Sequence, residues 1–405
     1  MDRMSEAWCG LDVHKKVVVA CLATPLADGT VGKVVRSFAT PTAGLLELAD
    51  WLAAGNCREV AMESPGSYWK PIFNILESRF AVIVVSGYQI KQLRGRKTDV
   101  RDAELIADLL RQGALRPSFV PKRAERELRE LVRYRASLIA EHSAETNRIQ
   151  KVLEGANIKL ASVVSNILGV SGREILKRLA AGETDANLMA DLARGKLRQK
   201  RDALAESLKG EMGPHQVFLL QEQLGHLADL EARIERASEE VERRLRPFQE
   251  TIKHLETIPG VARRAAEIIV SEVGLDMTRF PTAGHLASWT GLCPGMRESA
   301  GKNRSGRTPH GPVSLKSTLV QAAHASARTD TFIGARYRRL RARLGPQKAA
   351  VAVAHSLIVV IYHLLRHGAD YRDYAPTGTQ QEREVRRHTR RLERLGYKVT
   401  VEHVA

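Results

Sequence analysis

Cysteines are few in this 405-residue sequence, and it has no long apolar run. The four cysteines, at positions 9, 21, 57 and 293, include no CxxC pair and no histidine partner at zinc spacing, so we expect reduced thiols in a cytoplasmic protein. No stretch of 18 apolar residues is present, which excludes a membrane span by this criterion. The first residues also lack the basic-then-apolar layout of a signal peptide.

Acidic residues are fewer than basic residues. The sequence has 46 Asp and Glu and 63 Lys and Arg, which gives a formal net charge of +17. Such a surplus predicts a polyanionic partner, nucleic acid first. The alternative is a basic protein whose charge only keeps it soluble.

The positive charge is concentrated in two segments. Residues 297–343 contain eleven Lys or Arg but only two acidic residues, Glu298 and Asp330. Clustering of this kind favours contact with the phosphate backbone, whereas a solvated surface more often mixes both signs. The second cluster consists of Lys91, Arg94, Arg96, Lys97 and Arg101.

The hydrophobic pattern divides the chain into four regions: 1–118, 119–256, 257–375 and 376–405. In the first region, strand and helix signals alternate in the order ββαβαβα, which predicts a mixed α/β layered domain. The strands are expected at 8–22, 32–40, 58–62 and 80–86, and the helices at 45–54, 68–78 and 99–112. The first two strands are joined across Asp28 and Gly29.

The second region is expected to be helical, with long charged helices over 121–160 and 216–250 and a weakly patterned stretch between them. The later helix carries a heptad stripe, made of Leu220, Leu227, Ile234, Val241 and Phe248. The stripe predicts a coiled coil that is broken at Pro247. An antiparallel helical hairpin within one chain explains the stripe equally well.

The third region is expected to be mostly helical, with helices at 313–328 and 346–366 after a loop-like stretch at 281–315. It opens with Ile258-Pro259-Gly260-Val261, which is typical of a helix-hairpin-helix turn whose backbone amides meet a phosphate. A plain Pro-Gly turn is the alternative. The tail, 376–405, is polar and is expected to be peripheral.

Four carboxylates stand out in the first region. Asp12 lies within an apolar strand and Glu63 ends another, where an ionised carboxylate is costly unless it is paired or bound to a metal. Asp99 and Asp102 are three residues apart at the start of a helix and therefore share one face. If that helix packs over the two strands, the four groups converge on magnesium or manganese ions, and a pair of ions can activate a nucleophile at a phosphodiester.

Three of the carboxylates also have a simpler explanation. Asp12 alone caps a strand end, and Asp99 and Asp102 suit a helix N-terminus or pair with Arg96 and Arg101. Taken together, the four are typical of a ribonuclease H-like nuclease. Lys15, directly after His14 and three residues after Asp12, is a candidate phosphate contact, as are Arg96 and Lys97.

A serine-containing loop forms the second constellation. Ser299 is followed by two small residues, which allow close backbone approach. A serine oxygen needs activation to attack phosphorus, and cations with a metal-bound carboxylate supply it. A flexible basic loop that only grips DNA is the alternative, and Ser305 competes weakly with Ser299. The surrounding candidate phosphate contacts are Arg297, Lys302, Arg304 and Arg307.

Both constellations resemble one known family, the DEDD transposases of bacterial insertion sequences, and specifically the bridge-RNA-guided recombinase group. The resemblance spans roughly residues 8–370, with both parts in the expected order. The N-terminal runs that carry it are residues 10–15 (GLDVHK), 62–64 (MES) and 97–103 (KTDVRDA). The C-terminal runs, similar to that family's serine-bearing domain, are residues 258–261 (IPGV), 291–294 (GLCP) and 298–302 (ESAGK).

The resemblance implies an N-terminal domain similar to the RuvC Holliday-junction resolvase. It also implies that Asp12, Glu63, Asp99 and Asp102 are the metal-binding tetrad and that Ser299 forms a transient phosphoserine link to DNA. Dimers that pair into tetramers, and an element-encoded RNA that specifies target and donor by base pairing, are further implications. One departure is the segment 309–314 (PHGPVS), where relatives continue with a basic-Gly-Asn element.

The sequence therefore predicts a transposase or site-specific DNA recombinase of an insertion element. The first alternative is a RuvC-like structure-selective endonuclease, in which water attacks and the serine loop only binds, or a DNA invertase. The second is a non-catalytic nucleic-acid-binding scaffold.

Overall fold

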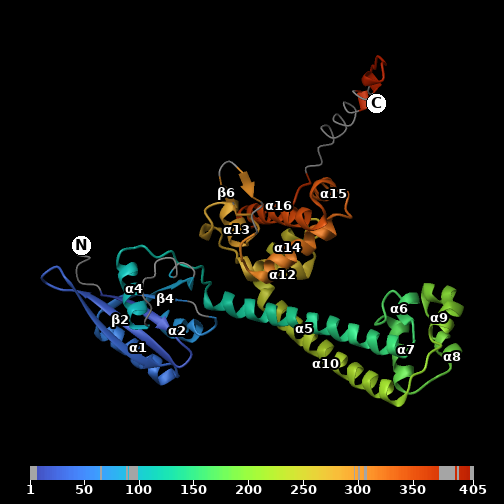
Figure 1. Cartoon of the computed structure of the whole chain (residues 1–405), viewed down its shortest axis with the longest axis horizontal. Helices are drawn as coiled ribbons and strands as arrows, with labels where there is room; N and C mark the ends of the chain where they lie inside the picture. Colours follow the sequence, from blue (N-terminus) through green and yellow to red (C-terminus); the bar gives the residue numbers. More distant parts are fainter. Residues whose placement is uncertain are drawn as a thin grey trace. The chain divides into compact units, whose positions relative to one another are not determined.

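The computed structural model describes residues 7–63, 66–87, 90, 99–295, 297–299, 302–304, 308–373, 388–389 and 392–401. The chain divides into two compact units, Met1–Arg123 and Ala124–Ala405. Each unit is described by itself (Figure 1).

The first unit is built on a five-stranded mixed sheet with the strand order β3-β2-β1-β4-β5. β1 pairs antiparallel with β2 and parallel with β4, β2 pairs antiparallel with β3, and β4 pairs parallel with β5. The predicted α/β class is confirmed for this unit. The strands are β1 (Ala7–Val13), β2 (Val17–Pro25), β3 (Val31–Ala39), β4 (Cys57–Glu63) and β5 (Ala81–Val85), and the helices are α1 (Thr42–Ala54), α2 (Trp69–Leu76) and α4 (Asp99–Arg111).

The sheet has one strand more than predicted, because residues 8–22 form a hairpin rather than one strand. The chain reverses at residues 14–16, where the His14 N–H donates to the Val17 carbonyl at 3.0 Å. His14, Lys15 and Lys16 are polar and exposed or half-buried. A continuous strand would carry these side chains into the apolar layers, so the turn keeps them in solvent.

Helices cover the two faces of the sheet. On one face, α1 and α2 pack through Leu45, Leu48, Leu52, Ile72 and Leu76 onto alternate residues of β1 that include Leu11. On the other face lies α4, whose Ile106 shares a hydrophobic cluster with Ala61 and Val85, and whose Ala103 and Ala107 share another with Val19 and Cys21. The period of two along β1 therefore directs Cys9, Leu11 and Val13 toward α1 and α2, and Gly10 and Asp12 toward α4.

The second unit begins with two long helices, α5 (Arg123–Gly155) and α10 (Pro214–Leu245), which lie side by side (Figure 1). Leu153 shares a cluster with Leu220, Leu138 with Leu230, and Leu128 with Leu245, so the helices are antiparallel. The heptad stripe packs inside the chain, as the hairpin alternative expects. α10 ends at Leu245, and Phe248 falls in the following 3-10 turn, Arg246–Phe248.

The short helices between α5 and α10 form a cluster at one end of this hairpin (Figure 1). Their core includes Ile158, Ile175, Leu179 and Leu204, which pack on Ile149 and Leu153 of α5. The helices are α6 (Leu160–Val163), α7 (Val170–Ala180), α8 (Ala186–Ala190) and α9 (Arg201–Ser207).

The C-terminal part of this unit is mostly helical, as predicted, but it contains two features that the sequence did not indicate. α15 was not predicted, and the stretch expected as a loop holds α13 and the strand pair β6–β7. The elements are α11 (Gln249–Glu256), α12 (Arg263–Val273), α13 (Ala283–Trp289), β6 (Arg297–Ser299), β7 (Lys302–Arg304), α14 (Val313–Ser326), α15 (Phe332–Leu344) and α16 (Pro346–His367).

Within the described residues, α16 alone is long and apolar enough to cross a membrane. It has 22 residues and a mean hydropathy of 1.8 in its most apolar window. Ala350, Val353, Leu357 and Ile361 on this helix are completely buried against α13, α14 and α15. This burial is the pattern expected of a core helix in the second unit.

Candidate active site and nucleic-acid interface

Two of the predicted carboxylates, Asp12 and Glu63, lie at matching positions on the neighbouring strands β1 and β4. In the parallel ladder of β1 and β4, Leu11 lies opposite Met62, and Asp12 and Glu63 come next on each strand. Asp12 is two residues after Gly10, and Glu63 is two residues after Ala61; both of these small residues face α4. Asp12 and Glu63 therefore lie at the same edge of the sheet and on the α4 face.

The third carboxylate, Asp102, belongs to α4, which lies across β1. A β-carbon at Gly10 would stand 2.2 Å from the Ala103 carbonyl oxygen and 2.4 Å from the Ala107 amide nitrogen, so the helix lies directly on the strand. Further along α4, the Asp108 carboxylate pairs with the Lys33 ammonium at 2.7 Å. Lys33 is level with the start of β1 in the sheet register. The first turn of α4, with the buried Asp102, therefore lies toward the end of β1 that carries Asp12.

Asp12 is buried, and its carboxylate contacts the imidazole of His14. The Oδ2 atom of Asp12 lies 3.1 Å from Nε2 of His14, and the two side chains are 9% and 40% exposed. His14 thus sits between the buried carboxylate and solvent. Lys15, the next residue, is exposed in the β1–β2 turn, and its carbonyl accepts a hydrogen bond from the Thr40 hydroxyl at 2.9 Å.

Gly87, to which no sequence motif points, lies against the Glu63 carboxylate. A β-carbon at Gly87 would stand 2.3 Å from Oε1 of Glu63. Any larger residue would have to displace the carboxylate from its position beside β5. The position of Gly87, two residues after the β5 strand, gave no chemical signal in the sequence.

The carboxylates have the chemistry of a site for a hard divalent cation, since oxygen ligands suit magnesium and manganese. Within the described part of the chain, no three His, Cys, Asp or Glu side chains are grouped so that they could hold a metal ion. Asp99 begins α4, but its side chain lies outside the described residues, as do Arg96, Lys97 and Arg307. The complete tetrad therefore stays a prediction.

The serine constellation forms a strand pair in the second unit. β6 and β7 are antiparallel, with Ser299 opposite Lys302, Glu298 opposite Asn303, and Arg297 opposite Arg304. The backbone register thus places three of the predicted basic residues on the same pair of short strands as Ser299. Their side chains lie outside the described part of the chain.

Close backbone packing holds the two ends of this segment together. Gly291 has a φ of +72°, and a β-carbon there would stand 2.7 Å from the Pro309 carbonyl oxygen. A β-carbon at Gly311 would stand 2.3 Å from the Thr290 carbonyl oxygen. The Lys316 ammonium donates to the Thr308 hydroxyl at 2.9 Å. Residues 309–314, where the sequence departs from the family pattern, therefore include Gly311, which this close packing requires.

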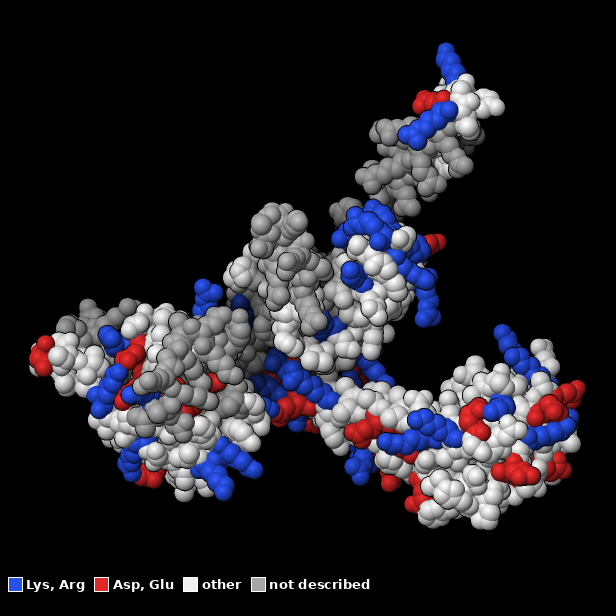
Figure 2. All heavy atoms as spheres, in the orientation of Figure 1, with Lys and Arg blue, Asp and Glu red and all other residues white. Residues whose placement is uncertain are grey.

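Some basic side chains of the third region are held by hydrogen bonds within the protein, and others are exposed. Arg338 donates to the carbonyls of Ala327 and Thr329 at 3.0 and 2.9 Å, and Lys316 is held as described above. Arg339, Arg341 and Arg343 are exposed along α15. Figure 2 shows Lys and Arg side chains gathered over this helix. These three guanidinium groups are available to contact a polyanion.

Comparison with known proteins gives two family matches. Residues 9–158 match the family described as DEDD transposase of the IS110 type, and residues 252–338 match the transposase family IS116/IS110/IS902. The first match contains Asp12, Glu63, Asp99 and Asp102, and the second contains Ser299.

Two bacterial insertion-element proteins are similar over most of their length. A 43.6 kDa protein of insertion element IS110 from Streptomyces coelicolor is 28% identical over 301 residues, which cover 70% of this chain and 74% of that protein. A 44.8 kDa protein of insertion element IS116 from Streptomyces clavuligerus is 28% identical over 269 residues, covering 61% and 66%. A solved structure of Thermus thermophilus RuvC aligns with 28% of this chain and 99% of its own, at 13% identity and a TM-score of 0.22.

The two family matches occur in the order that the sequence motifs predict, and together they include both candidate constellations. The chain is a transposase of the IS110/IS116 family, an enzyme that cleaves and rejoins DNA.

Proposed function

We propose that this transposase moves its insertion element by a serine-linked exchange of DNA strands at a metal-binding acidic tetrad. The observation that carries the proposal is the placement of Asp12 and Glu63 at one edge of the sheet, with the first turn of α4 seated toward them by Gly10. The tetrad is Asp12, Glu63, Asp99 and Asp102, and the nucleophile is Ser299.

The four carboxylates are proposed to hold magnesium or manganese, which would stabilise negative charge on the reacting phosphate. Asp12 and Asp102 are 6% and 5% exposed, and carboxylate oxygens are the ligands that these ions prefer. The contact between His14 and Asp12 orients that carboxylate. Lys15, exposed in the adjoining turn, is placed to contact the DNA backbone.

The serine step is an exchange of esters. The Ser299 oxygen bonds to phosphorus while one P–O bond of the DNA backbone breaks. The serine proton is taken by a base at the site, and the departing sugar oxygen receives a proton. Because one phosphodiester replaces another, rejoining needs no external energy source. The basic residues opposite and beside Ser299, namely Arg297, Lys302 and Arg304, are proposed to bind the phosphate.

The remaining features of the proposal follow from the resemblance. They are a guide RNA that pairs with DNA, and assembly into dimers and tetramers in which one subunit's carboxylates work with another subunit's serine. We place this activity in the cytoplasm, where the DNA is accessible. The net charge of +17 suits binding to both nucleic acids.

The test is to look for protein attached to cleaved DNA. Wild-type protein, with element-end DNA, magnesium and the element's RNA, is expected to yield a product that migrates as a protein–DNA adduct under denaturing conditions. Ser299→Ala should abolish the adduct while leaving DNA binding unchanged, and Ser305→Ala is the matched control that should retain it. Cleaved DNA without attached protein would instead establish the endonuclease alternative, and an adduct in Ser299→Ala would reject this serine.

A further inference from the structure

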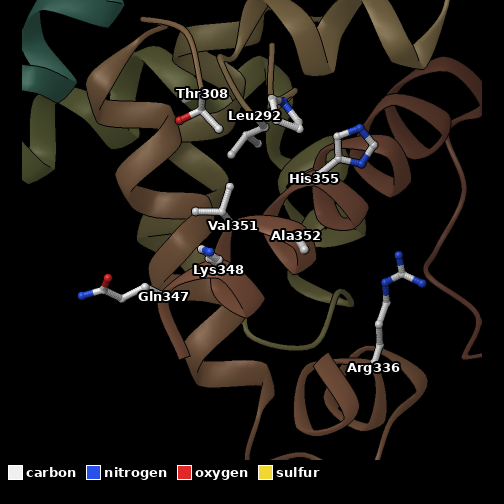
Figure 3. Close-up of a pocket in the computed structure, with 9 residues that line it drawn as sticks. Leu292, Thr308, Arg336, Gln347, Lys348, Val351, Ala352 and His355 are labelled. Carbon is white, nitrogen blue, oxygen red and sulfur yellow. The ribbon is translucent and has the colours of Figure 1, made fainter. Parts of the chain in front are cut away.

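A pocket of about 590 Å³ lies in the second unit beside the base of the β6–β7 segment (Figure 3). Leu292 and Pro294 precede that segment, Thr308 follows it, and Arg336 lines the pocket from α15. One face of α16 supplies the rest of the lining, at positions related by helical spacing. These residues are Lys348, Val351, Ala352 and His355, with Gln347 beside them.

Arg336 contains a buried donor without an acceptor. Its Nε atom is shielded from solvent and makes no hydrogen bond, and in the described part of the chain only Gln223 has another such side-chain atom. Leaving a buried donor unpaired is unfavourable, and more so where the group is charged. A guanidinium presents its donors in a planar fork that matches a phosphate. The positive charge of this guanidinium at the pocket wall, rather than its shielded Nε, favours an anionic ligand.

The rest of the pocket suits a phosphate that carries an organic group. Lys348 adds a second positive charge, and the described lining contains no Asp or Glu. Leu292, Val351 and Ala352 form an apolar wall, which a free inorganic ion would leave uncovered. His355 and Thr308 can hydrogen-bond to a sugar or base. A nucleotide has all of these parts: an anion, polar edges and an apolar face.

The position of the pocket, next to the segment with Ser299, indicates that the nucleotide belongs to the DNA strand. Leu292, Pro294 and Thr308 belong to the two chain ends that lead into and out of the segment with Ser299. Packing between Gly291 and Pro309 fixes those two ends against each other. A strand that occupied the pocket would thus be tethered next to the serine-bearing hairpin.

We propose that this pocket binds one nucleotide of the DNA strand undergoing exchange, with its phosphate on Arg336 and Lys348 and its sugar or base against Leu292 and Val351. The inference rests on the proposed serine chemistry for its choice of DNA. The pocket anchors the strand and so positions the attacked phosphate. Arg336 is a positioning residue here, because it acts on a nucleotide beside the reacting one.

The test measures binding in a chain that cannot react. Full-length Ser299→Ala protein is titrated into fluorescein-labelled single-stranded DNA from the element end, and into an RNA of the same sequence, at about 0.2 M salt to suppress non-specific contacts. Arg336→Gln is compared with Arg236→Gln, which removes the same charge from an exposed site on α10. Ala352→Leu fills the pocket without a charge change. Thermal melting checks that each variant is folded.

Arg336→Gln is expected to weaken DNA binding about tenfold, as the loss of a charge-assisted hydrogen bond does, while Arg236→Gln changes it about twofold or less. Ala352→Leu should weaken DNA binding as well, and inorganic phosphate should compete only weakly. Equal effects of the two arginine variants, no effect of Ala352→Leu, or an effect on RNA alone would overturn the proposal. Because no chemistry is measured, failure here is distinct from failure of the serine nucleophile, which the adduct assay reports.

Discussion

The α-carbon of Gly10 lies so close to Ala103 that a β-carbon on Gly10 would stand 2.2 Å from the Ala103 carbonyl oxygen. This contact sets the height of α4 above β1. It also fixes which turn of α4 reaches the strand edge with Asp12, since Asp102 directly precedes Ala103. Glycine is unusual in the middle of a strand because it has no side chain to pack. Here it is explained by α4, which lies directly on the strand at Gly10.

Gly10→Ala is therefore expected to destabilise the first unit and to displace α4 from the candidate site. The new methyl group meets backbone atoms of Ala103 and Ala107, which have no rotamer to change, and overpacking of this kind costs about 1–3 kcal/mol. Gly225→Ala is the control, because nothing lies within 4 Å of a β-carbon there and alanine favours a helix by about 1 kcal/mol. Thermal melting should show a lower midpoint for the first variant only. Equal midpoints would contradict the close approach.

Asp12→Asn and Asp102→Asn are each expected to abolish DNA cleavage while leaving DNA binding in place. Loss of groups that merely orient metal ligands costs about 10–100-fold in affinity or activity, so loss of a ligand should cost at least about a hundredfold. Asp108→Asn is the control on the same helix, since that carboxylate pairs with Lys33 at the other end of α4. The assay is strand cleavage with magnesium present, and full activity of Asp12→Asn would refute the metal tetrad.

Much of the fold could be predicted from the sequence, because strand and helix periods are local. The strand at Cys57–Glu63 and the helices at Thr42–Ala54 and Asp99–Arg111 fall within a few residues of their expected positions. The β1–β2 hairpin was missed because apolar residues on both sides of His14-Lys15-Lys16 resemble one long strand. α15 was missed because its many arginines hide the short apolar stripe of Ile333 and Tyr337, which joins the core.

The candidate site was partly predictable for a different reason. A carboxylate inside an apolar strand is conspicuous in any sequence, so Asp12 and Glu63 stood out. Gly87 and the nucleotide pocket depend on which backbone segments come together, and no local pattern records that. Arg336 was noticed only as one of many arginines. Its unpaired Nε becomes evident once α15 and α16 are placed together.

Glu267→Gln is expected to destabilise the second unit strongly. Glu267 on α12 accepts from Nη2 of Arg135 on α5 at 2.6 Å, and these side chains are 6% and 4% exposed. Removing one member of a buried pair costs about 3–5 kcal/mol, because the other charge is left without compensation. The control is Glu250→Gln, whose exposed pair with Lys253 should contribute little. Unfolding midpoints in urea measure both, and similar midpoints would show that the buried pair is dispensable.

Glu231 ties α10 to α7 and α5 in a way that should make stability depend on pH. Hydrogen bonds from the Arg173 guanidinium, and to a lesser extent from His142, hold the pKa of Glu231 below its ordinary value. A carboxyl whose pKa is lower in the folded chain adds stability above its unfolded pKa, which is about 4.3, and loses it as the pH falls through the folded value. Because the side chain is 34% exposed, we expect a contribution of about 1 kcal/mol at most.

Wild-type protein should therefore melt at a higher temperature than Glu231→Gln at pH 7, and the gap should close as the pH falls below about 5, toward the folded pKa of Glu231. The control is Glu235→Gln, one turn further along α10, where the side chain is exposed and a small effect is expected at every pH. Melting temperatures from pH 3 to pH 8 give both comparisons. A gap that stays constant down to pH 3 would mean that Glu231 contributes through packing, because a neutral glutamic acid would then stabilise the contact as well as the carboxylate does.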